Sequence, residues 1–135
     1  MLLPCYNEEA AIGATVRGFR EALPRATIYV YDNNSRDRTR EIAAEAGAIV
    51  RTERQQGKGH VVRRMFADID ADVYVMADGD LTYDPRAAPA MVDMLVADQL
   101  DMVVGTRRHE LKDAYRGGHV LGNRLFTGLD RKSVV

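Results

Sequence analysis

The sequence has a single cysteine, no long hydrophobic run and almost no net charge, and each of these absences excludes a class of protein. Cys5 has no partner for an internal disulfide, so a reducing, cytoplasmic setting is the simplest expectation. No apolar stretch approaches the roughly 20 residues that cross a bilayer, and none resembles a signal peptide. The net charge of -1 gives no electrostatic reason to expect nucleic acid or an anionic membrane as a general partner.

What is present fits one globular domain. The chain has 135 residues, of which 46% are hydrophobic and 29% charged, enough to build a core and a solvated surface. No repeat or linker divides it, so we expect residues 1–135 to belong to one domain. Both ends look cut: only three residues precede Pro4, fewer than a typical strand, and the tail has no capping signal.

Strand-like and helix-like segments alternate along the chain. Four short stretches are rich in β-branched and aromatic residues, and they predict buried strands at 26–32, 48–52, 72–78 and 101–106. Helical patterns lie between them. This alternation predicts an α/β fold with a mainly parallel sheet and helices on both faces.

The helical patterns have recognisable faces and ends. One face repeats at helical spacing (Ile12, Val16, Phe19 and Leu23), and a later one is formed by Val61, Val62, Met65, Phe66 and Ile69. Between them, Ser35 or Asp37 is the expected N-cap of a helix that Gly47 ends. Asp84 followed by Pro85 predicts a further helix start, with Met91, Val92 and Leu95 facing the core.

Polar clusters follow the expected strands. "PCYNEE", "DNNSRD", "RTERQQGKG", "DGD" and "GTRR" come after the first to the fifth strand in turn. The carboxyl ends of parallel strands meet at one edge of a sheet, where open α/β sheets bind their ligands. The sequence therefore predicts a binding site at that edge.

The residues of these clusters suit a metal-bound diphosphate. Asp78 and Asp80 offer oxygen ligands to Mg²⁺ or Mn²⁺, which also take phosphate and water. Gly79 between them removes a side chain where a ligand could approach the backbone. Lys58 lies between two glycines at a helix start, and Arg107 and Arg108 suit phosphate oxygens. Asp32 could accept a hydrogen bond from a base or ribose.

Each of these features also has a purely structural interpretation. An Asp-x-Asp pair is common in turns, and a lysine between glycines is usually a solvated loop residue. Asp32, Asn33 and Asn34 could build a turn and cap the next helix. Asp84 is better explained as a cap than as a metal ligand, and Cys5 as a small buried residue. The histidines have no spacing that suggests zinc: His60, His109 and His119.

Together the motifs resemble a known family. "LPCYNEEAAIGATV", "VYDNNSRDRT", "GKGHVVRRMF", "MADGDLTYDP" and "GTRR" occur in the order and spacing of the family 2 glycosyltransferases, which are inverting enzymes of the GT-A fold. Within that family the chain is most similar to the polyprenyl- and dolichyl-phosphate sugar synthases. The resemblance runs from about Leu3 to Arg107. It implies that residues 1–135 are the N-terminal, donor-binding part of a GT-A domain whose acceptor side is largely missing.

The resemblance also implies roles for residues. Asp78 and Asp80 are the catalytic residues that hold the metal on the diphosphate, and Asp32 or Asn33 reads the base. The implied nucleotide-sugar contacts are Pro4, Tyr6, Glu8, Asp32, Asn33, Lys58, Asp78, Gly79, Asp80 and Arg107. The implied donor is a UDP- or GDP-sugar. The implied acceptor is a polyprenyl phosphate or a glycan, at the cytoplasmic face of a membrane that a missing C-terminal part could contact.

Alternatives of other classes remain open from the residues. A nucleotidyltransferase making nucleotide sugars would share the sheet and the metal, but it normally begins with a glycine-rich loop that "LPCYNEE" is not. A phosphoacceptor signalling domain also clusters acids and a lysine at strand ends. A fragment that binds nucleotide without catalysis is the third possibility, because an acceptor hydroxyl would need a base and none can be assigned.

Overall fold

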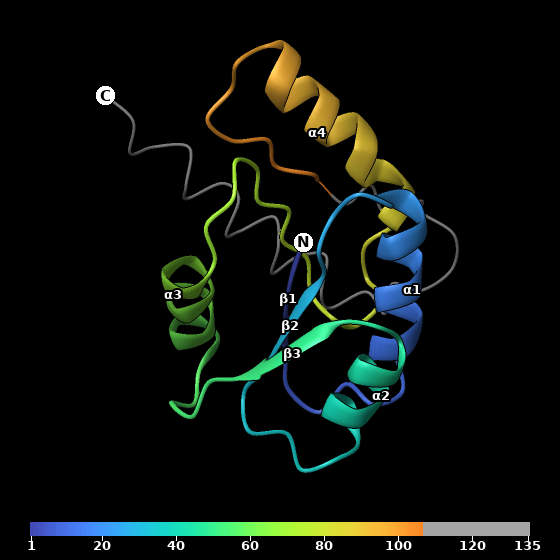
Figure 1. Ribbon diagram of the computed structural model, residues 1–135, viewed down its shortest axis with the longest axis vertical. Helices are drawn as coiled ribbons and strands as arrows, with labels where there is room; N and C mark the ends of the chain where they lie inside the picture. The colour runs from blue at the N-terminus through green and yellow to red at the C-terminus, as the bar shows by residue number, and fades with distance from the viewer. Residues whose placement is uncertain (107–135) are drawn as a thin grey trace, which may run out of the picture. The chain divides into compact units, whose positions relative to one another are not determined.

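The fold is given by a computed structural model that describes residues 1–106 (Figure 1). Met1–Val104 forms one compact unit. Arg107 and Arg108, the two arginines expected to bind phosphate, lie outside the described residues. None of the helices in the described part of the chain is long and apolar enough to cross a membrane.

Within residues 1–106, three parallel strands form the sheet. They are β1 (Leu2–Cys5), β2 (Tyr29–Asp32) and β3 (Ile49–Thr52), in the order β1-β2-β3. The register pairs Cys5 with Asp32 and Asp32 with Thr52, so the three strands end side by side. The expected strand at 48–52 is confirmed, and the one at 26–32 is shortened to its second half. The stub before Pro4 also forms a strand, because β1 continues through Pro4 to Cys5.

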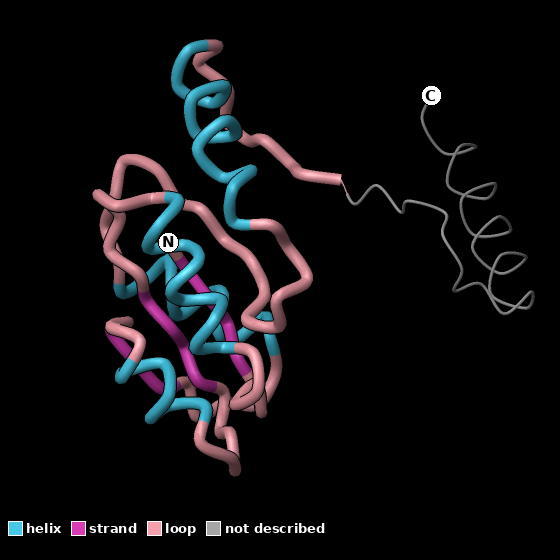
Figure 2. The backbone as a smooth tube through the Cα atoms, turned by 90° about the vertical axis from the view of Figure 1, so that its right-hand side faces the viewer, coloured by secondary structure: helices cyan, strands magenta, loops and turns pink. Residues whose placement is uncertain are grey.

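Helices cover both faces of the sheet, as the alternation predicts. Neighbouring residues of a strand point to opposite faces. Leu3 and Val30 pack with α1 (Ile12–Ala22) in one core cluster, and Leu2 and Tyr31 pack with α3 (Lys58–Asp68) in the other. Figure 1 shows α3 on the opposite side of the strands from α1, and Figure 2 shows the strands between helices in the perpendicular view.

The expected strand at 72–78 shrinks to a single bridge between Leu2 and Met76. Leu2 N donates to Val75 O at 2.8 Å, and Ala77 N donates to Leu2 O at 3.2 Å. The next donor on this side of β1 would be the backbone N–H of residue 4, which proline lacks. The ladder therefore stops at Leu2, and the chain leaves the sheet just before Asp78.

The predicted strand at 101–106 is wrong. The structure has no strand there, and the side chains of Met102 and Val104 are 74% and 73% exposed. A buried strand needs a sheet edge that pairs with it. Within the described residues the segment 101–106 pairs with no strand, so its β-branched residues do not form the predicted strand.

The helices mostly start and end where the sequence predicts. The α1 face is buried at Ile12, Val16 and Phe19. Gly47, with φ of +92°, follows α2 (Thr39–Glu45), a backbone conformation that suits glycine. Asp84 caps a 3₁₀ turn, η1 (Pro85–Ala87), that leads into α4 (Ala88–Ala97), by accepting from Arg86 N at 3.0 Å.

Two details of the helices differ from the prediction. In α3, Val61 and Met65 are buried, but Phe66 is 49% exposed and packs edge-on against Tyr74. Neither Ser35 nor Asp37 is the N-cap of α2, because Arg38 occupies that position without a side-chain cap, and the Ser35 hydroxyl accepts from Asn7 N at 2.8 Å. Asp37 is closer to the predicted role, since its carboxylate accepts from Thr39 N at 3.0 Å.

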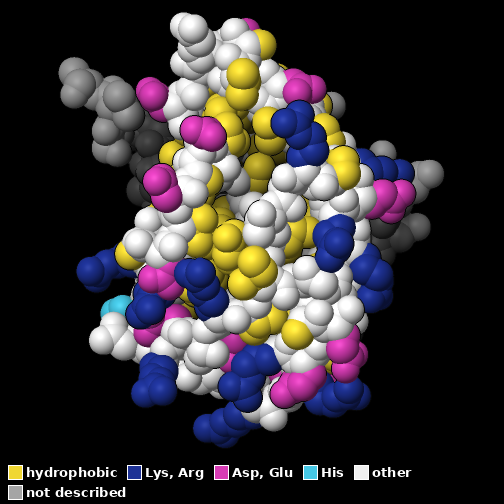
Figure 3. Space-filling model, in the orientation of Figure 1, with side chains coloured by type: hydrophobic (Ala, Val, Ile, Leu, Met, Phe, Trp, Pro, Cys, Tyr) yellow, Lys and Arg dark blue, Asp and Glu magenta, His cyan; other side chains and the backbone are white. Residues whose placement is uncertain are grey.

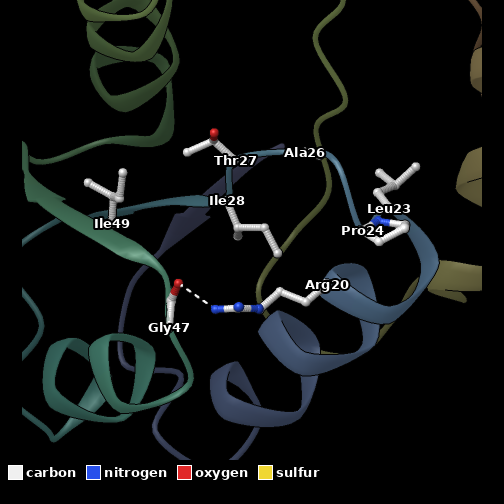
Figure 4. Close-up of a pocket in the computed structure, with 8 residues that line it drawn as sticks. All are labelled: Arg20, Leu23, Pro24, Ala26, Thr27, Ile28, Gly47 and Ile49. Carbon is white, nitrogen blue, oxygen red and sulfur yellow. Dashed lines mark hydrogen bonds between the residues drawn. The ribbon is translucent and has the colours of Figure 1, made fainter.

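Hydrophobic side chains gather across the middle of one face (Figure 3). Two hollows lie at the amino-terminal ends of the strands. One, of about 460 Å³, is lined by Leu23, Pro24, Ile28 and Ile49, with Arg20 hydrogen-bonded to Gly47 O at its wall (Figure 4). The other, of about 780 Å³, lies between residues 22–29, residues 69–75 and part of α4. Both are at the opposite end of the strands from the predicted site.

Candidate functional site

Four of the five predicted polar clusters meet at the carboxyl edge of the sheet, where hydrogen bonds and an ion pair join them. The fifth, "GTRR", follows a segment that is not a strand, and its two arginines lie outside the described residues. The electrostatics at Cys5, the last residue of β1, show which acids surround that point. Burial raises the pKa of the Cys5 thiol, and the negative charges of four nearby carboxylates raise it further: those of Glu8, Asp32, Asp78 and Asp80. These acids come from loops that follow three different strand segments, so the fold concentrates negative charge at this edge.

Asp32 ends the central strand and is fully buried. Its Oδ2 accepts from Ser35 N at 3.2 Å and lies 3.9 Å from Nε of Arg40. Its Oδ1 is buried and has no hydrogen-bond partner among the described residues. Buried carboxylate oxygens are almost always paired, and leaving one without a donor costs about 1–3 kcal/mol or more. This oxygen is therefore suited to accept a hydrogen bond from a ligand.

Asn33 has a different task. Its Nδ2 donates to Glu53 O at 2.9 Å and Gln55 O at 2.8 Å, and its Oδ1 accepts from Gly57 N at 2.6 Å. The buried amide thus holds the whole loop between β3 and α3. Between the two residues that could read the base, the hydrogen bonds favour Asp32, because both N–H groups of the Asn33 amide and one acceptor position of its oxygen are already used within the protein.

The "NEE" and "SRDRT" stretches interlock. Asn7 N donates to Ser35 Oγ, and Arg36 N donates to Asn7 Oδ1 at 2.9 Å. The same exchange repeats at Glu9, whose N donates to Asp37 Oδ2 at 3.1 Å and whose Oε2 accepts from Arg38 N at 3.0 Å. In each case a side chain of one loop accepts a hydrogen bond from a backbone N–H group of the other loop. Much of the motif is therefore structural.

Glu8 lies between Asn7 and Glu9, the two residues that interlock the loops. Its backbone N donates to Thr39 Oγ1 at 2.8 Å, which fixes its position. Partial burial raises the pKa of the Glu8 carboxyl, and the charges of Asp80, Asp37 and Asp78 raise it further. A site that disfavours one more negative charge in this way favours a cation.

Asp78 and Asp80 follow the bridge to β1 at the point where the chain leaves the sheet. Asp78 pairs with the ammonium of Lys58, the first residue of α3. Asp80 Oδ1 accepts from Thr82 N at 2.9 Å. Lys58 and the two acids, predicted separately, are thus brought together. Carboxylate oxygens suit Mg²⁺ or Mn²⁺, so the donor chemistry fits such an ion. The described residues contain no group of three metal-ligating side chains, so phosphate or water would complete the coordination.

Gly79 is buried between these acids and packs onto the protein's own core. A Cβ added to Gly79 would lie 2.5 Å from Cys5 Sγ and 3.2 Å from Ile12 Cδ1. Thr15 Oγ1 donates to Gly79 O at 3.1 Å. The close approach that requires glycine is therefore to Cys5, whereas the predicted backbone contact with a sugar nucleotide stays a prediction.

The remaining predicted residues differ in exposure. Tyr6 is 48% exposed at the start of the loop after β1, where a ligand could reach it. Pro4 is buried within β1, where it ends the hydrogen-bond ladder. Sequence reasoning missed the supporting residues Thr15, Thr39 and Arg40. The one signal in the sequence that could have identified these three residues is that each is polar within an apolar or helical segment.

The chain is similar to known proteins along most of its length. The family described as "Glycosyl transferase family 2" matches residues 1–133. The chain is 51% identical over 120 residues to the protein RfbJ of Shigella flexneri, covering 88% of this chain and 93% of RfbJ. It is 36% identical over 128 residues to the glycosyltransferase AglJ of Haloferax volcanii, covering 93% of this chain and 42% of AglJ.

A solved structure extends the likeness to the fold. Glucosyl-3-phosphoglycerate synthase from Mycobacterium tuberculosis, in complex with Mn²⁺, UDP-glucose and phosphoglyceric acid, has a TM-score of 0.63 and 28% identity. The match covers 70% of this chain and 37% of that one. The chain thus spans almost all of RfbJ but less than half of AglJ and of this enzyme.

Proposed function

Since the chain belongs to glycosyl transferase family 2, we propose that it binds a nucleoside diphosphate sugar and takes part in transfer of the sugar, with inversion, to an acceptor. The observation that carries the proposal is the buried Oδ1 of Asp32, which has no hydrogen-bond partner within residues 1–106 and lies at the same sheet edge as Asp78 and Asp80. A nucleotide supplies a polar base edge for Asp32 and a metal-bound diphosphate for Asp78 and Asp80.

The residues then have separate tasks. Asp32 accepts a hydrogen bond from the base or ribose, and exposed Tyr6 lies beside the nucleoside. Asp78 and Asp80 would hold Mg²⁺ or Mn²⁺, an ion that when bound supplies positive charge to a departing diphosphate. Lys58, and Arg107 beyond the described residues, add positive charge to the same group. The Mn²⁺ and UDP-glucose complex of the M. tuberculosis enzyme supports this assignment of donor and metal.

The acceptor is proposed from chemistry and from relatives. A lipid phosphate is already an anionic nucleophile and needs no protein base, which fits a chain whose described residues offer no assignable base. Dolichol-phosphate mannosyltransferase of Pyrococcus furiosus, 28% identical over 114 residues and covering 79% of this chain and 32% of that one, supports a lipid phosphate. We therefore propose a polyprenyl phosphate acceptor at the cytoplasmic face of a membrane, with a glycan as the alternative.

The test is a titration of the protein with UDP-, GDP- and dTDP-sugars, with and without Mn²⁺, by isothermal titration calorimetry. We expect one nucleotide family to bind in a Mn²⁺-dependent way. Release of nucleoside diphosphate from that donor, with polyprenyl phosphate present, separates an enzyme from a non-catalytic binder. Failure of every nucleotide sugar to bind with Mn²⁺ would overturn the proposal, and formation of nucleotide sugar from sugar phosphate would favour a nucleotidyltransferase.

A further inference from the structure

The contact between Lys58 and Asp78 joins two residues with different proposed ligands. Lys58 Nζ pairs with Asp78 Oδ1, an oxygen of the proposed metal-binding pair. The lysine side chain is 61% exposed and that of Asp78 is 32% exposed, so solvent reaches the pair. An ammonium group and a divalent cation repel each other at a few ångströms. The two cations therefore compete for the same carboxylate oxygen.

The position of Lys58 is set by the fold. Gly57 precedes it with φ of +129°, a conformation that few other residues adopt, and α3 begins at Lys58 itself. The N–H of Gly57 is held by Asn33, which also holds the carbonyls of Glu53 and Gln55. The root of the lysine is therefore fixed beside the acids, whereas its long side chain can turn about several bonds.

The surroundings of Asp78 explain why a cation is needed there. The raised pKa of Glu8, caused by burial and then by Asp80, Asp37 and Asp78, reports a concentration of negative charge. Lys58 partly compensates that charge within the protein itself. An ion pair with side chains this exposed is weak, so a stronger cation can exchange with it.

We propose that Lys58 is an exchangeable counter-ion, which pairs with Asp78 before the metal binds and moves to the diphosphate once the metal has taken Asp78. The inference rests on the proposed function. It predicts that metal and nucleotide bind with positive coupling: a metal alone must displace Lys58, whereas a metal bound with a nucleotide leaves the lysine a new anionic partner.

The experiment measures Mn²⁺ binding alone, from the electron paramagnetic resonance signal of free Mn²⁺, and then UDP and GDP binding at saturating Mn²⁺. In Lys58→Met we expect Mn²⁺ alone to bind roughly two- to fivefold more tightly, the range that a half-exposed ion pair provides. We expect the nucleotide to bind more weakly in the same variant. The matched control is Arg63→Met, which removes a positive charge from an exposed position of α3 and should change neither affinity.

The outcomes separate the two proposals. Unchanged or weaker binding of Mn²⁺ alone to Lys58→Met overturns the exchange while leaving Mn²⁺-dependent nucleotide binding of the parent protein intact. Equal gains in Lys58→Met and Arg63→Met would also overturn it, because they would reflect net charge alone. If the parent protein binds no nucleotide with Mn²⁺, the proposed function itself fails. Circular dichroism establishes that both variants are folded.

Discussion

The hydroxyl of Thr15 hydrogen-bonds to the backbone carbonyl of Gly79 at 3.1 Å, sharing its one proton with the carbonyl of Ala11 at the same distance. This bond fastens the residue between Asp78 and Asp80 to α1, which is part of the main core cluster. The two acids are therefore held on a loop whose centre is anchored, even though their side chains reach solvent. Anchoring of this kind lowers the entropy that the loop must lose when a ligand binds.

Gly79→Ala should destabilise the protein by about 1–3 kcal/mol, the usual cost of overpacking a core, because the new methyl group meets Cys5 Sγ. Cys5→Ala removes that sulfur, so the same substitution should cost less in the Cys5→Ala background. Urea denaturation of the four proteins measures the difference. Gly59→Ala is the control, since its Cβ would meet nothing within 4 Å. Additive effects of the two substitutions would contradict the packing.

Asp80→Ala should abolish Mn²⁺-dependent nucleotide binding and leave the melting temperature almost unchanged, because this carboxylate is exposed on a loop. Calorimetric titration with and without Mn²⁺ measures the effect. Asp84→Ala removes an acid four positions later that caps η1 and should retain the metal dependence. Unchanged Mn²⁺-dependent affinity in Asp80→Ala would show that the metal is held elsewhere.

Asp32→Asn should weaken binding of the preferred nucleoside diphosphate by about 1–3 kcal/mol, since an acceptor for the base or ribose is lost. Inorganic diphosphate with Mn²⁺ should bind the variant as before. Comparing the two ligands by competition titration distinguishes base reading from loop support. Equal losses for both ligands would mean that Asp32 serves to hold its own loop through Ser35 and Arg40.

Asn33→Ala should act through the loop instead. The substitution leaves the carbonyls of Glu53 and Gln55 and the N–H of Gly57 without their partner. Amide hydrogen exchange in residues 53–58 should therefore become faster, and both nucleotide and inorganic diphosphate should bind less well because Lys58 is less firmly placed. Selective loss of nucleotide binding with unchanged exchange would instead assign base reading to Asn33.

Cys5 should be unreactive toward thiol reagents in the folded protein, because burial and then the neighbouring acids raise its pKa. Release of thionitrobenzoate from Ellman's reagent at about pH 8 should require denaturant. The folded thiol holds its proton more tightly than the unfolded one. Its contribution to stability is thus complete below the ordinary thiol pKa of 9.0 and falls as pH rises above it. Cys5→Ala should lack that decline, and rapid reaction of the native thiol would contradict the burial.

The sequence predicts best what depends on local pattern. The spacing of Ile12, Val16 and Phe19 defines α1, and the Asp84–Pro85 step marks the start of η1. It fails where pairing decides the outcome: the segment 72–78 looks like a full strand, and only its position beside Pro4 shows why the ladder stops. The clustering of Asp32, Lys58, Asp78 and Asp80 could be predicted because each lies at or after the carboxyl end of a predicted parallel strand. The division of labour between Asp32 and Asn33 does not, because it depends on where one amide group points.

The interlocked loops at Asn7, Glu9, Ser35 and Asp37 bear on how such sequences change over evolutionary time. Their side chains accept hydrogen bonds from backbone N–H groups of the neighbouring loop, so selection for a folded protein alone would preserve them. A descendant that had stopped transferring sugar would keep this part of the motif for as long as it kept its fold. On the proposed roles, loss of activity would show first at half-buried Asp78 and at exposed Lys58 and Asp80, whose side chains do little for the core. Those three positions are therefore the more sensitive markers for distinguishing an active family member from an inactive one.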